Sequence, residues 1–159
     1  MQINSFAPIV SQKSTVLILG TMPGNDSLKY AQYYAHPRNA FWKILFEIYN
    51  NQYSDDYNSK KELLVKNNLA LWDVLASCFR QSSLDTDITL EKPNDIALFL
   101  QQYSNIKHIV FNGKAAERYL KKYFKHLSLS STIMPSTSPA NAISYAKKML
   151  MWKNIVHLT

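Results

Sequence analysis

TVLILGTMPGNDSLKYAQYYAHPRNAFW, residues 15–42, is the stretch from which the rest of the expected architecture follows. Its first part, residues 15–20, is a run of β-branched and apolar residues that ends at Gly20, as expected of a parallel strand buried on both faces. Residues 21–24 (TMPG) predict a sharp turn, because Pro23 fixes one backbone dihedral and the flanking glycines allow a close backbone approach. The stretch therefore predicts a buried strand with a tight turn at its carboxyl end.

Aromatic and polar side chains crowd the segment after this turn, and Pro37 interrupts it before Phe41 and Trp42. Ligands of open α/β sheets bind just beyond the carboxyl ends of strands, so the cluster predicts a binding or catalytic site. The competing interpretation is the aromatic edge of a hydrophobic core. We favour a site, because the prolines place the polar residues in a loop. The cluster comprises Tyr30, Gln32, Tyr33, Tyr34, His36, Arg38 and Asn39.

Farther along the chain, short apolar runs alternate with amphipathic stretches. A short helical turn is expected from Asp26 or Ser27, and longer helices over residues 39–49, 59–68, 94–102, 114–126 and 140–157. Further strands are expected over residues 69–74, 106–111 and 131–134. Residues 1–14 and 76–93 show no sustained period, so we expect an irregular leading segment and a long surface loop there.

This alternation predicts an α/β fold, a three-layer α/β/α domain with a mainly parallel four-stranded central sheet. No repeat, low-complexity tract or linker interrupts the sequence, so a single domain over residues 1–159 is expected. Right-handed crossovers place four polar loops at one edge of the sheet, residues 21–39, 73–78, 112–114 and 135–141. Their convergence predicts one composite site.

Composition and charge narrow the class of protein. No run approaches the ~18 apolar residues that span a bilayer, and no signal-peptide pattern opens the sequence, so we expect an intracellular protein. Cys78 is the only cysteine, which argues against disulfides within the chain, zinc–thiolate sites and iron–sulfur clusters, and predicts a buried, inert thiol. The net charge of +7 favours an anionic partner, most commonly nucleic acid.

Several motifs resemble those of one enzyme family. GTMPG (residues 20–24) and YYAHPRNAFWK (residues 33–43) resemble the first motif of the uracil-DNA glycosylase superfamily, in the form carried by the mismatch-specific uracil glycosylases. MPSTSPA (residues 134–140) lies where that superfamily has its late, Pro-Ser-rich DNA-intercalating loop. Together with ALWDVLASC (residues 70–78) and FNG (residues 111–113), the pattern is most similar to the hypoxanthine (deoxyinosine) DNA glycosylase branch.

The resemblance implies a DNA repair enzyme, a monofunctional DNA-deoxyinosine glycosylase that hydrolyses the N-glycosidic bond of a deaminated base after base flipping. Hypoxanthine is the expected base, with uracil and xanthine as further candidates. DNA is the implied partner of a monomeric, cytoplasmic protein, and the chemistry needs no metal, cofactor or membrane. One alternative is a non-catalytic nucleic-acid-binding domain of the same fold, and another is a nucleotide- or small-molecule-binding α/β protein.

Catalysis depends on how the attacking water is held. Met22 stands at the turn position where relatives place Asn or Asp for this purpose, and a thioether accepts hydrogen bonds poorly. Asn39 is the predicted catalytic replacement, because its amide oxygen can align water, although Asn39 is also well placed to cap the following helix. Asn112 is the second predicted catalytic residue, whose donor and acceptor suit a purine edge, with a simple Asn-Gly turn as the alternative.

The resemblance also implies binding residues. The predicted substrate-binding set is Gly20, Met22, Pro23, Gly24, Tyr34, His36 and Asp73, with Tyr34 as the stacking platform and Asp73 at the base-reading position. Core filling, a bond to a backbone amide and a structural histidine are the alternatives for Tyr34, Asp73 and His36. The predicted DNA-contacting set is Gly113, Lys114, Ser136, Thr137, Ser138, Pro139, Ala140 and Asn141. Ala140 replaces the usual Leu wedge and Ser136 the usual His or Asn, so intercalation would need another residue, such as Pro139 or Asn141.

Overall fold

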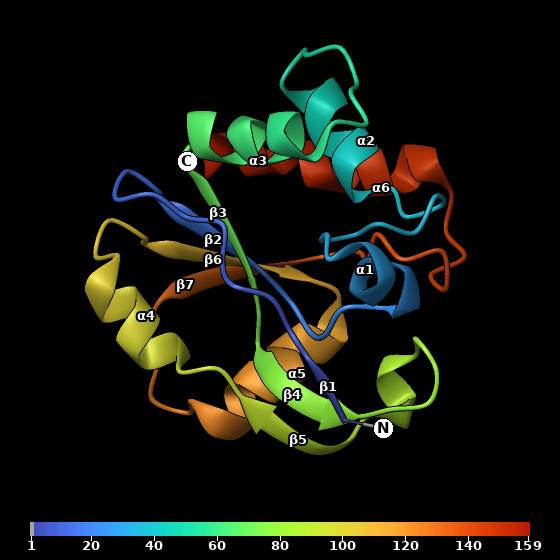
Figure 1. Cartoon of the computed structure of the whole chain (residues 1–159). Helices are drawn as coiled ribbons and strands as arrows, with labels where there is room; N and C mark the ends of the chain where they lie inside the picture. Colours follow the sequence, from blue (N-terminus) through green and yellow to red (C-terminus); the bar gives the residue numbers. More distant parts are fainter. Residues whose placement is uncertain (1) are drawn as a thin grey trace.

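A computed structural model describes residues 2–159, which leaves only Met1 of the expected 1–159 domain outside the description (Figure 1). The central sheet has four parallel strands in the order β3 (Leu69–Asp73), β2 (Val16–Gly20), β6 (His108–Asn112) and β7 (Ser130–Met134). The predicted α/β class and the four-stranded parallel sheet are therefore confirmed.

Two helical layers cover the sheet, because β2 is apolar on both faces. Val16 and Ile18 pack into one core cluster, and Leu17 and Leu19 into the other. Figure 1 shows α2 (Phe41–Ile48), α3 (Tyr57–Lys66) and α6 (Tyr145–Trp152) above the sheet, and α4 (Ile96–Gln102) and α5 (Lys114–Tyr123) below it. A short α1 (Asn25–Tyr30) follows the turn after β2, and the 3₁₀ helix η2 (Lys153–His157) follows α6.

Two helices begin later or earlier than the sequence predicts. The Asp56 carboxylate caps α3 by accepting from the Ser59 backbone N–H at 3.0 Å, so the helix starts before the predicted Ser59 cap. The last helix starts at Tyr145 instead of residue 140, because the Ser144 hydroxyl caps it and residues 135–144 form irregular turns. For α3 the Asp56 cap replaces the cap predicted at Ser59, and for α6 the Ser144 cap sets a later start than residue 140.

The expectations for residues 1–14 and 76–93 were wrong in part, because both contribute to a second, antiparallel sheet. Its strands are β1 (Gln2–Asn4), β4 (Leu75–Phe79) and β5 (Thr89–Pro93), in the order β1-β4-β5. Two register irregularities between β4 and β5 break the alternation that would identify a hairpin in the sequence. The short 3₁₀ helix η1 (Asp85–Asp87) lies in the connection between them. Cys78, in β4, is buried as predicted, and burial raises the pKa of its thiol.

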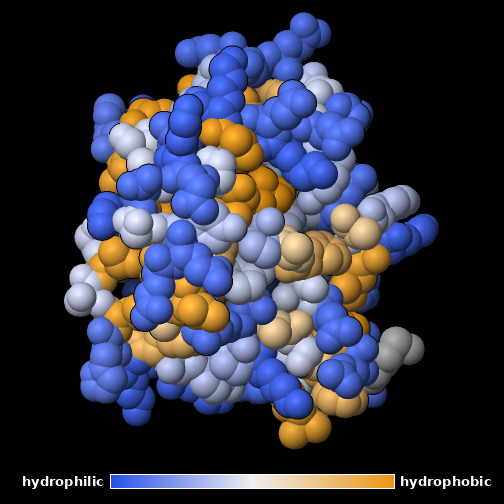
Figure 2. Space-filling view, turned by 60° about the vertical axis from the view of Figure 1, so that its left-hand side comes forward, coloured by the Kyte–Doolittle hydropathy of each residue, from blue (hydrophilic) through white to orange (hydrophobic). Residues whose placement is uncertain are grey.

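The outer surface is mostly polar. Figure 2 shows one face, on which hydrophilic residues predominate and hydrophobic ones form separate patches, as on most globular proteins. Within residues 2–159, no helix combines the length and apolar character that crossing a bilayer requires.

Phe41 is the aromatic centre of the upper core, and its removal should be costly. The side chain is fully buried, with ring centroids 4.2 Å from Tyr34, 4.9 Å from Trp42 and 5.8 Å from Trp152. We expect Phe41→Ala to lower the free energy of unfolding by roughly 3–5 kcal/mol in urea denaturation, because the cavity cannot collapse between rigid rings. The exposed neighbour Lys43 provides the control, and Lys43→Ala should change stability by less than about 0.5 kcal/mol.

Candidate active site

A cleft of about 530 Å³ opens at the carboxyl ends of β2, β3 and β6. Two of the predicted loops, residues 21–39 and 135–141, contribute most of its walls, and Asp73 and Asn112 line it from the ends of their strands. In Figure 1 the segments that form it lie on the right-hand side, around α1. The lining includes every predicted substrate-binding residue and both predicted catalytic residues, namely Gly20, Met22, Pro23, Gly24, Tyr34, His36, Asn39, Asp73 and Asn112.

Two polar side chains meet beside the bare backbone of Gly20. A Cβ atom at Gly20 would lie 2.5 Å from Asp73 Oδ1 and 2.8 Å from the Tyr34 hydroxyl oxygen, so any larger residue would displace both groups. Asp73 Oδ2 and the Tyr34 hydroxyl are buried, and neither has a hydrogen-bond partner among the residues described. Buried polar atoms without partners are rare and destabilising, and a ligand in the cleft could satisfy them.

The Asp73 carboxyl group titrates close to neutrality. Burial is the main cause that raises its pKa to about 7; the charge of Asp85 acts in the same direction and that of Arg80 opposes it. Burial also raises the pKa of Asp85, which lines the cleft from η1. A substantial fraction of Asp73 is therefore a neutral acid at pH 7, able to donate one hydrogen bond and accept another.

Tyr34 is held rigidly at the edge of the core. Its backbone has a left-handed φ of 54°, and its ring packs at 4.2 Å and 32° on Phe41. Burial, followed by the charge of Asp73, raises the pKa of its hydroxyl far above the usual value, against a smaller opposing effect of the Asn112 side chain, so the group remains protonated and able to donate. Tyr34 lines the cleft and also packs against the core, so the stacking and core-filling interpretations describe parts of the same arrangement.

Asn39 lines the cleft and also supports the start of α2. Its Oδ1 accepts from the Phe41 backbone N–H at 3.0 Å, whereas the N-cap position itself is Ala40, which has no capping side chain. An amide oxygen has two lone pairs, so this bond leaves room for one from water. Met22, in contrast, is buried in the lower core cluster, where its thioether packs against apolar side chains.

His36 belongs to the wall of the cleft beside α1. Its Nδ1 accepts from the Arg38 backbone N–H at 3.0 Å, and its Nε2 lies 3.8 Å from an oxygen of Asp26, which also lines the cleft. The side chain thus has the structural hydrogen bond that was its alternative interpretation.

The late loop is anchored to the sheet by Asn112. Asn112 Nδ2 donates to the Thr137 hydroxyl, and Asn112 Oδ1 accepts from the Thr137 backbone N–H, both at 3.0 Å. The Thr137 carbonyl accepts from the Ala40 N–H at 3.0 Å, and the Trp152 indole N–H donates to the Pro135 carbonyl at 2.8 Å. Asn112 therefore positions the late loop with one N–H and one lone pair of its amide, and its contact with a purine edge, which would use the second N–H or lone pair, stays a prediction.

Two predicted DNA contacts are not available at the surface. Thr137 is fully buried, and the Gly113 N–H donates to the Met134 carbonyl at 3.0 Å. Gly113 has a φ of +94°, and an added Cβ would come within 3.1 Å of Ser136, so glycine is needed for close packing with the late loop. These two residues shape the site from within.

The other predicted DNA-contacting residues differ in position. Ser136, Ser138 and Asn141 form hydrogen bonds within the late loop, where they line the cleft with Pro139 and Ala140. Lys114 is exposed at the start of α5, outside this lining. The buried Lys148 of α6 donates from Nζ to the Ser138 carbonyl at 3.0 Å, a support that sequence analysis did not identify.

One wall of the cleft was missed entirely. Residues Ser83, Leu84, Asp85 and Thr86 line it from the β4–β5 connection. The Ser83 hydroxyl accepts from the Asn25 N–H at 2.9 Å, and the buried Arg80 guanidinium donates to the Pro23 carbonyl. The Ser- and Asp-rich run between two short apolar segments was the available signal, since such runs mark hairpin turns.

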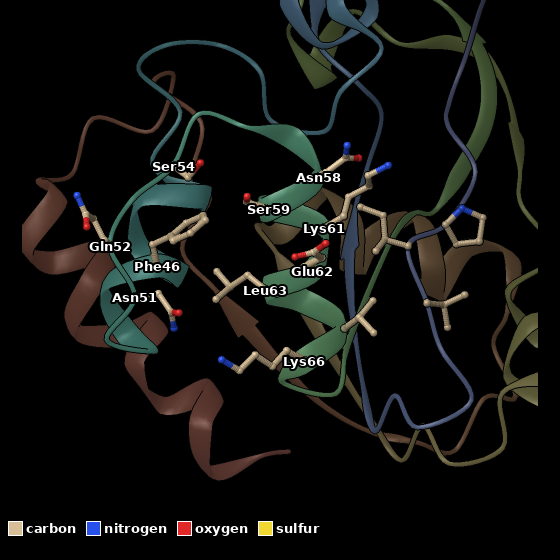
Figure 3. Close-up of a pocket in the computed structure, with 14 residues that line it drawn as sticks. Phe46, Asn51, Gln52, Ser54, Asn58, Ser59, Lys61, Glu62, Leu63 and Lys66 are labelled. Atoms are coloured by element: carbon tan, nitrogen blue, oxygen red, sulfur yellow. The ribbon is translucent and has the colours of Figure 1, made fainter.

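A larger hollow, of about 980 Å³, lies beside α3 (Figure 3). Its charged side chains, Lys61, Glu62 and Lys66, come from that helix. None of the buried unpartnered polar atoms described in residues 2–159 lines it, so we place the candidate site in the smaller cleft. Across those residues there is also no cluster of His, Cys, Asp and Glu suited to a metal ion.

Comparisons with known proteins agree with this architecture. Over 153 residues, and 96% of both chains, the protein is 32% identical to a protein named hypoxanthine DNA glycosylase from Methanosarcina barkeri. It is 30% identical to a protein of the same name from Methanosarcina acetivorans over 86% of both chains. The solution NMR structure of a candidate uracil DNA glycosylase from Methanosarcina acetivorans superposes with a TM-score of 0.86, at 28% identity and 99% coverage of both chains.

The family assignment rests on nearly the whole chain. The model of the uracil DNA glycosylase superfamily matches residues 7–157, which include all the elements that form the cleft. The cleft at the strand ends, the two motif loops and the shared fold agree with that match. The chain therefore belongs to the uracil DNA glycosylase superfamily.

Proposed function

We propose that this DNA glycosylase is monofunctional and releases hypoxanthine from deaminated DNA by hydrolysing the N-glycosidic bond after base flipping. The observation that carries the proposal is the pair of buried, unpartnered polar atoms of Asp73 and Tyr34 in the cleft. The names of the Methanosarcina relatives support hypoxanthine as the base.

Base recognition follows from the hydrogen-bonding edge of a deaminated base. Hypoxanthine presents an N–H beside a C=O, and a neutral carboxylic acid pairs with such an edge by accepting from the N–H and donating to the C=O. Asp73 provides this pair when protonated, as buried acids in other sites do. Uracil and xanthine carry the same edge, so we include both as weaker candidate substrates. Ionised Asp73 would instead repel the carbonyl oxygen.

Bond cleavage then needs a held base and an aligned water. Stacking on Tyr34, whose ring is backed by Phe41, would hold the flipped base at a contribution of roughly 1–3 kcal/mol. The base departs with the electron pair of the glycosidic bond, water adds to the sugar carbon, and the proton that this water loses is taken up by the departing base anion. Asn39 lines the same cleft, and its amide oxygen can accept a hydrogen bond from this water. The buried thioether of Met22 accepts such bonds poorly.

The alternative proposal is a non-catalytic nucleic-acid-binding domain, favoured by the thioether of Met22 at the water-holding position. Incubation with a duplex that carries one labelled deoxyinosine, followed by hot alkali, separates the two. We expect strand breakage at the lesion and none in a duplex with deoxyguanosine at that position, because only base release creates an alkali-labile site. Retention of the lesion duplex without breakage would favour the binding domain.

The pH dependence of base release should report Asp73. We expect single-turnover release of hypoxanthine to decline as pH rises through about 7, because the neutral acid that donates to the base carbonyl is lost. Asp73→Asn keeps a donor and an acceptor at all pH values, so this variant should remain active and lose the decline. A wild-type rate that is level from pH 6 to 9, or an equal decline in the variant, would contradict recognition by the neutral acid.

The stability of the fold should also depend on the protonation of Asp73. The pKa of Asp73 is raised from 3.8 in the unfolded chain to about 7 in the folded one, so the folded state retains a proton that the unfolded state loses. The free energy of unfolding should therefore fall between pH 4 and 7. Urea denaturation should find Asp73→Asn more stable than the wild type at pH 8, with a much smaller difference at pH 4.

Asn39 can be tested by separating catalysis from stability. Asn39→Ala should slow single-turnover base release by roughly 10²–10³-fold, the scale for one preorganised polar group. It should also lower stability by about 1 kcal/mol, because the Phe41 N–H loses its acceptor. Asn39→Asp should preserve that bond and most of the stability.

Asn67→Ala is the matched control for stability. The Asn67 amide donates to the Leu63 carbonyl at 2.8 Å at the end of α3, outside the cleft. Its loss should destabilise the chain to a similar degree and leave base release unchanged below the melting range. Near-normal release by Asn39→Ala would rule out the catalytic assignment of Asn39.

A further inference from the structure

The wall missed by sequence analysis carries an exposed apolar side chain at the cleft. Leu84 lies in the β4–β5 connection, lines the cleft and is 49% exposed. Among the large apolar side chains described as exposed in residues 2–159, it is the one that lines this cleft. Single exposed leucines are common on protein surfaces, so it is the position of Leu84 at the cleft that makes it informative.

The loop that carries Leu84 is fastened to the motif turn. The Ser83 hydroxyl accepts from the Asn25 N–H at 2.9 Å, and Ser83 also packs against Gly24, where an added Cβ would lie 3.4 Å from its oxygen. The buried Arg80 guanidinium donates to the Pro23 carbonyl from the same segment. The backbone at Leu84 is therefore held at a defined place relative to the turn that follows β2 and hence to the cleft.

The late loop on the other wall cannot supply a comparable side chain. Ala140 is exposed and ends in a single methyl group, and Thr137 is buried. Of the two residues predicted to replace the usual Leu wedge, Pro139 is a partly buried, compact ring and Asn141 is tied to the Ser136 carbonyl at 3.0 Å. A base that leaves a duplex opens a gap in the stack, and proteins fill such gaps with apolar side chains. Among the cleft-lining residues described, Leu84 on the β4–β5 side is therefore the large apolar side chain that is exposed.

We propose that Leu84 is the wedge that enters the DNA base stack when the lesion base is flipped into the cleft. The inference rests on the proposed glycosylase function and assigns a DNA-contacting residue to a segment outside the family's motif loops. Two acids, Asp85 and Asp87, follow Leu84 in the same loop. The Asp87 carboxylate accepts from the Ser82 hydroxyl, and Asp85 lines the cleft with a half-buried side chain.

Strand context provides the test, because a wedge matters only where neighbouring base pairs are stacked. Leu84→Ala should slow base release from a deoxyinosine duplex by roughly 10-fold, since it removes most of the apolar surface of the leucine side chain. Release from the same oligonucleotide as a single strand should be unchanged. Leu84→Met should restore the duplex rate. Leu98→Ala is the matched control, because Leu98 is also 49% exposed but lies on α4, outside the cleft.

A second readout follows opening of the stack without cleavage. The fluorescence of 2-aminopurine placed next to the lesion should increase when the wild type binds the duplex, because its base unstacks. The increase should be smaller with Leu84→Ala and unchanged with Leu98→Ala. If Leu84→Ala slowed base release equally on duplex and single strand, or on neither, the assignment of Leu84 as the wedge would be wrong. A fluorescence increase that depends on Leu84, without any base release, would support insertion of Leu84 and refute the glycosylase proposal. Absence of both signals in the wild type would refute both.

Discussion

The close approach of Asp73 and Tyr34 over the Gly20 backbone is the constraint around which the site is built. Adjacent parallel strands bring Gly20 and Asp73 into register, so the carboxyl group is placed by the sheet itself. Only a residue without a side chain leaves room for both polar groups, as the 2.5 Å and 2.8 Å separations from a Cβ position show. This arrangement buries the Asp73 carboxyl group, and burial raises its pKa to about 7.

The late loop, which forms another wall of the cleft, is held in place by several hydrogen bonds. Asn112, at the end of β6, binds both polar groups of Thr137, and Trp152 and Lys148 of α6 bind the carbonyls of Pro135 and Ser138. The late loop is therefore held from the sheet and from a helix at once. Such anchoring reduces the conformational freedom that would otherwise be lost when DNA binds.

The β4–β5 connection completes the site from the opposite side. Arg80 and Ser83 bind the backbone on either side of Gly24, and Asp85 places a second acid near Asp73. The charges of Asp85 and Arg80 act in opposite directions on the pKa of Asp73. The β4–β5 connection thus influences both the shape of the cleft and the protonation of Asp73, although it contains none of the motifs that identify the superfamily.

The parallel sheet, both helical layers and the location of the cleft were predictable from local sequence, because β2 is apolar on both faces and the polar loops follow strand ends. The motif residues Tyr34, Asn39 and Asp73 were identified as part of the site for the same reason. The antiparallel sheet was not predictable, because β1 pairs with β4 more than seventy residues away and β5 joins β4 with irregular register. Likewise, the buried state of Thr137, the bonded N–H of Gly113 and the cleft-facing position of Leu84 depend on neighbours distant in sequence. Periodicity records which faces are apolar, whereas the partner of each polar group is settled only when the chain has packed.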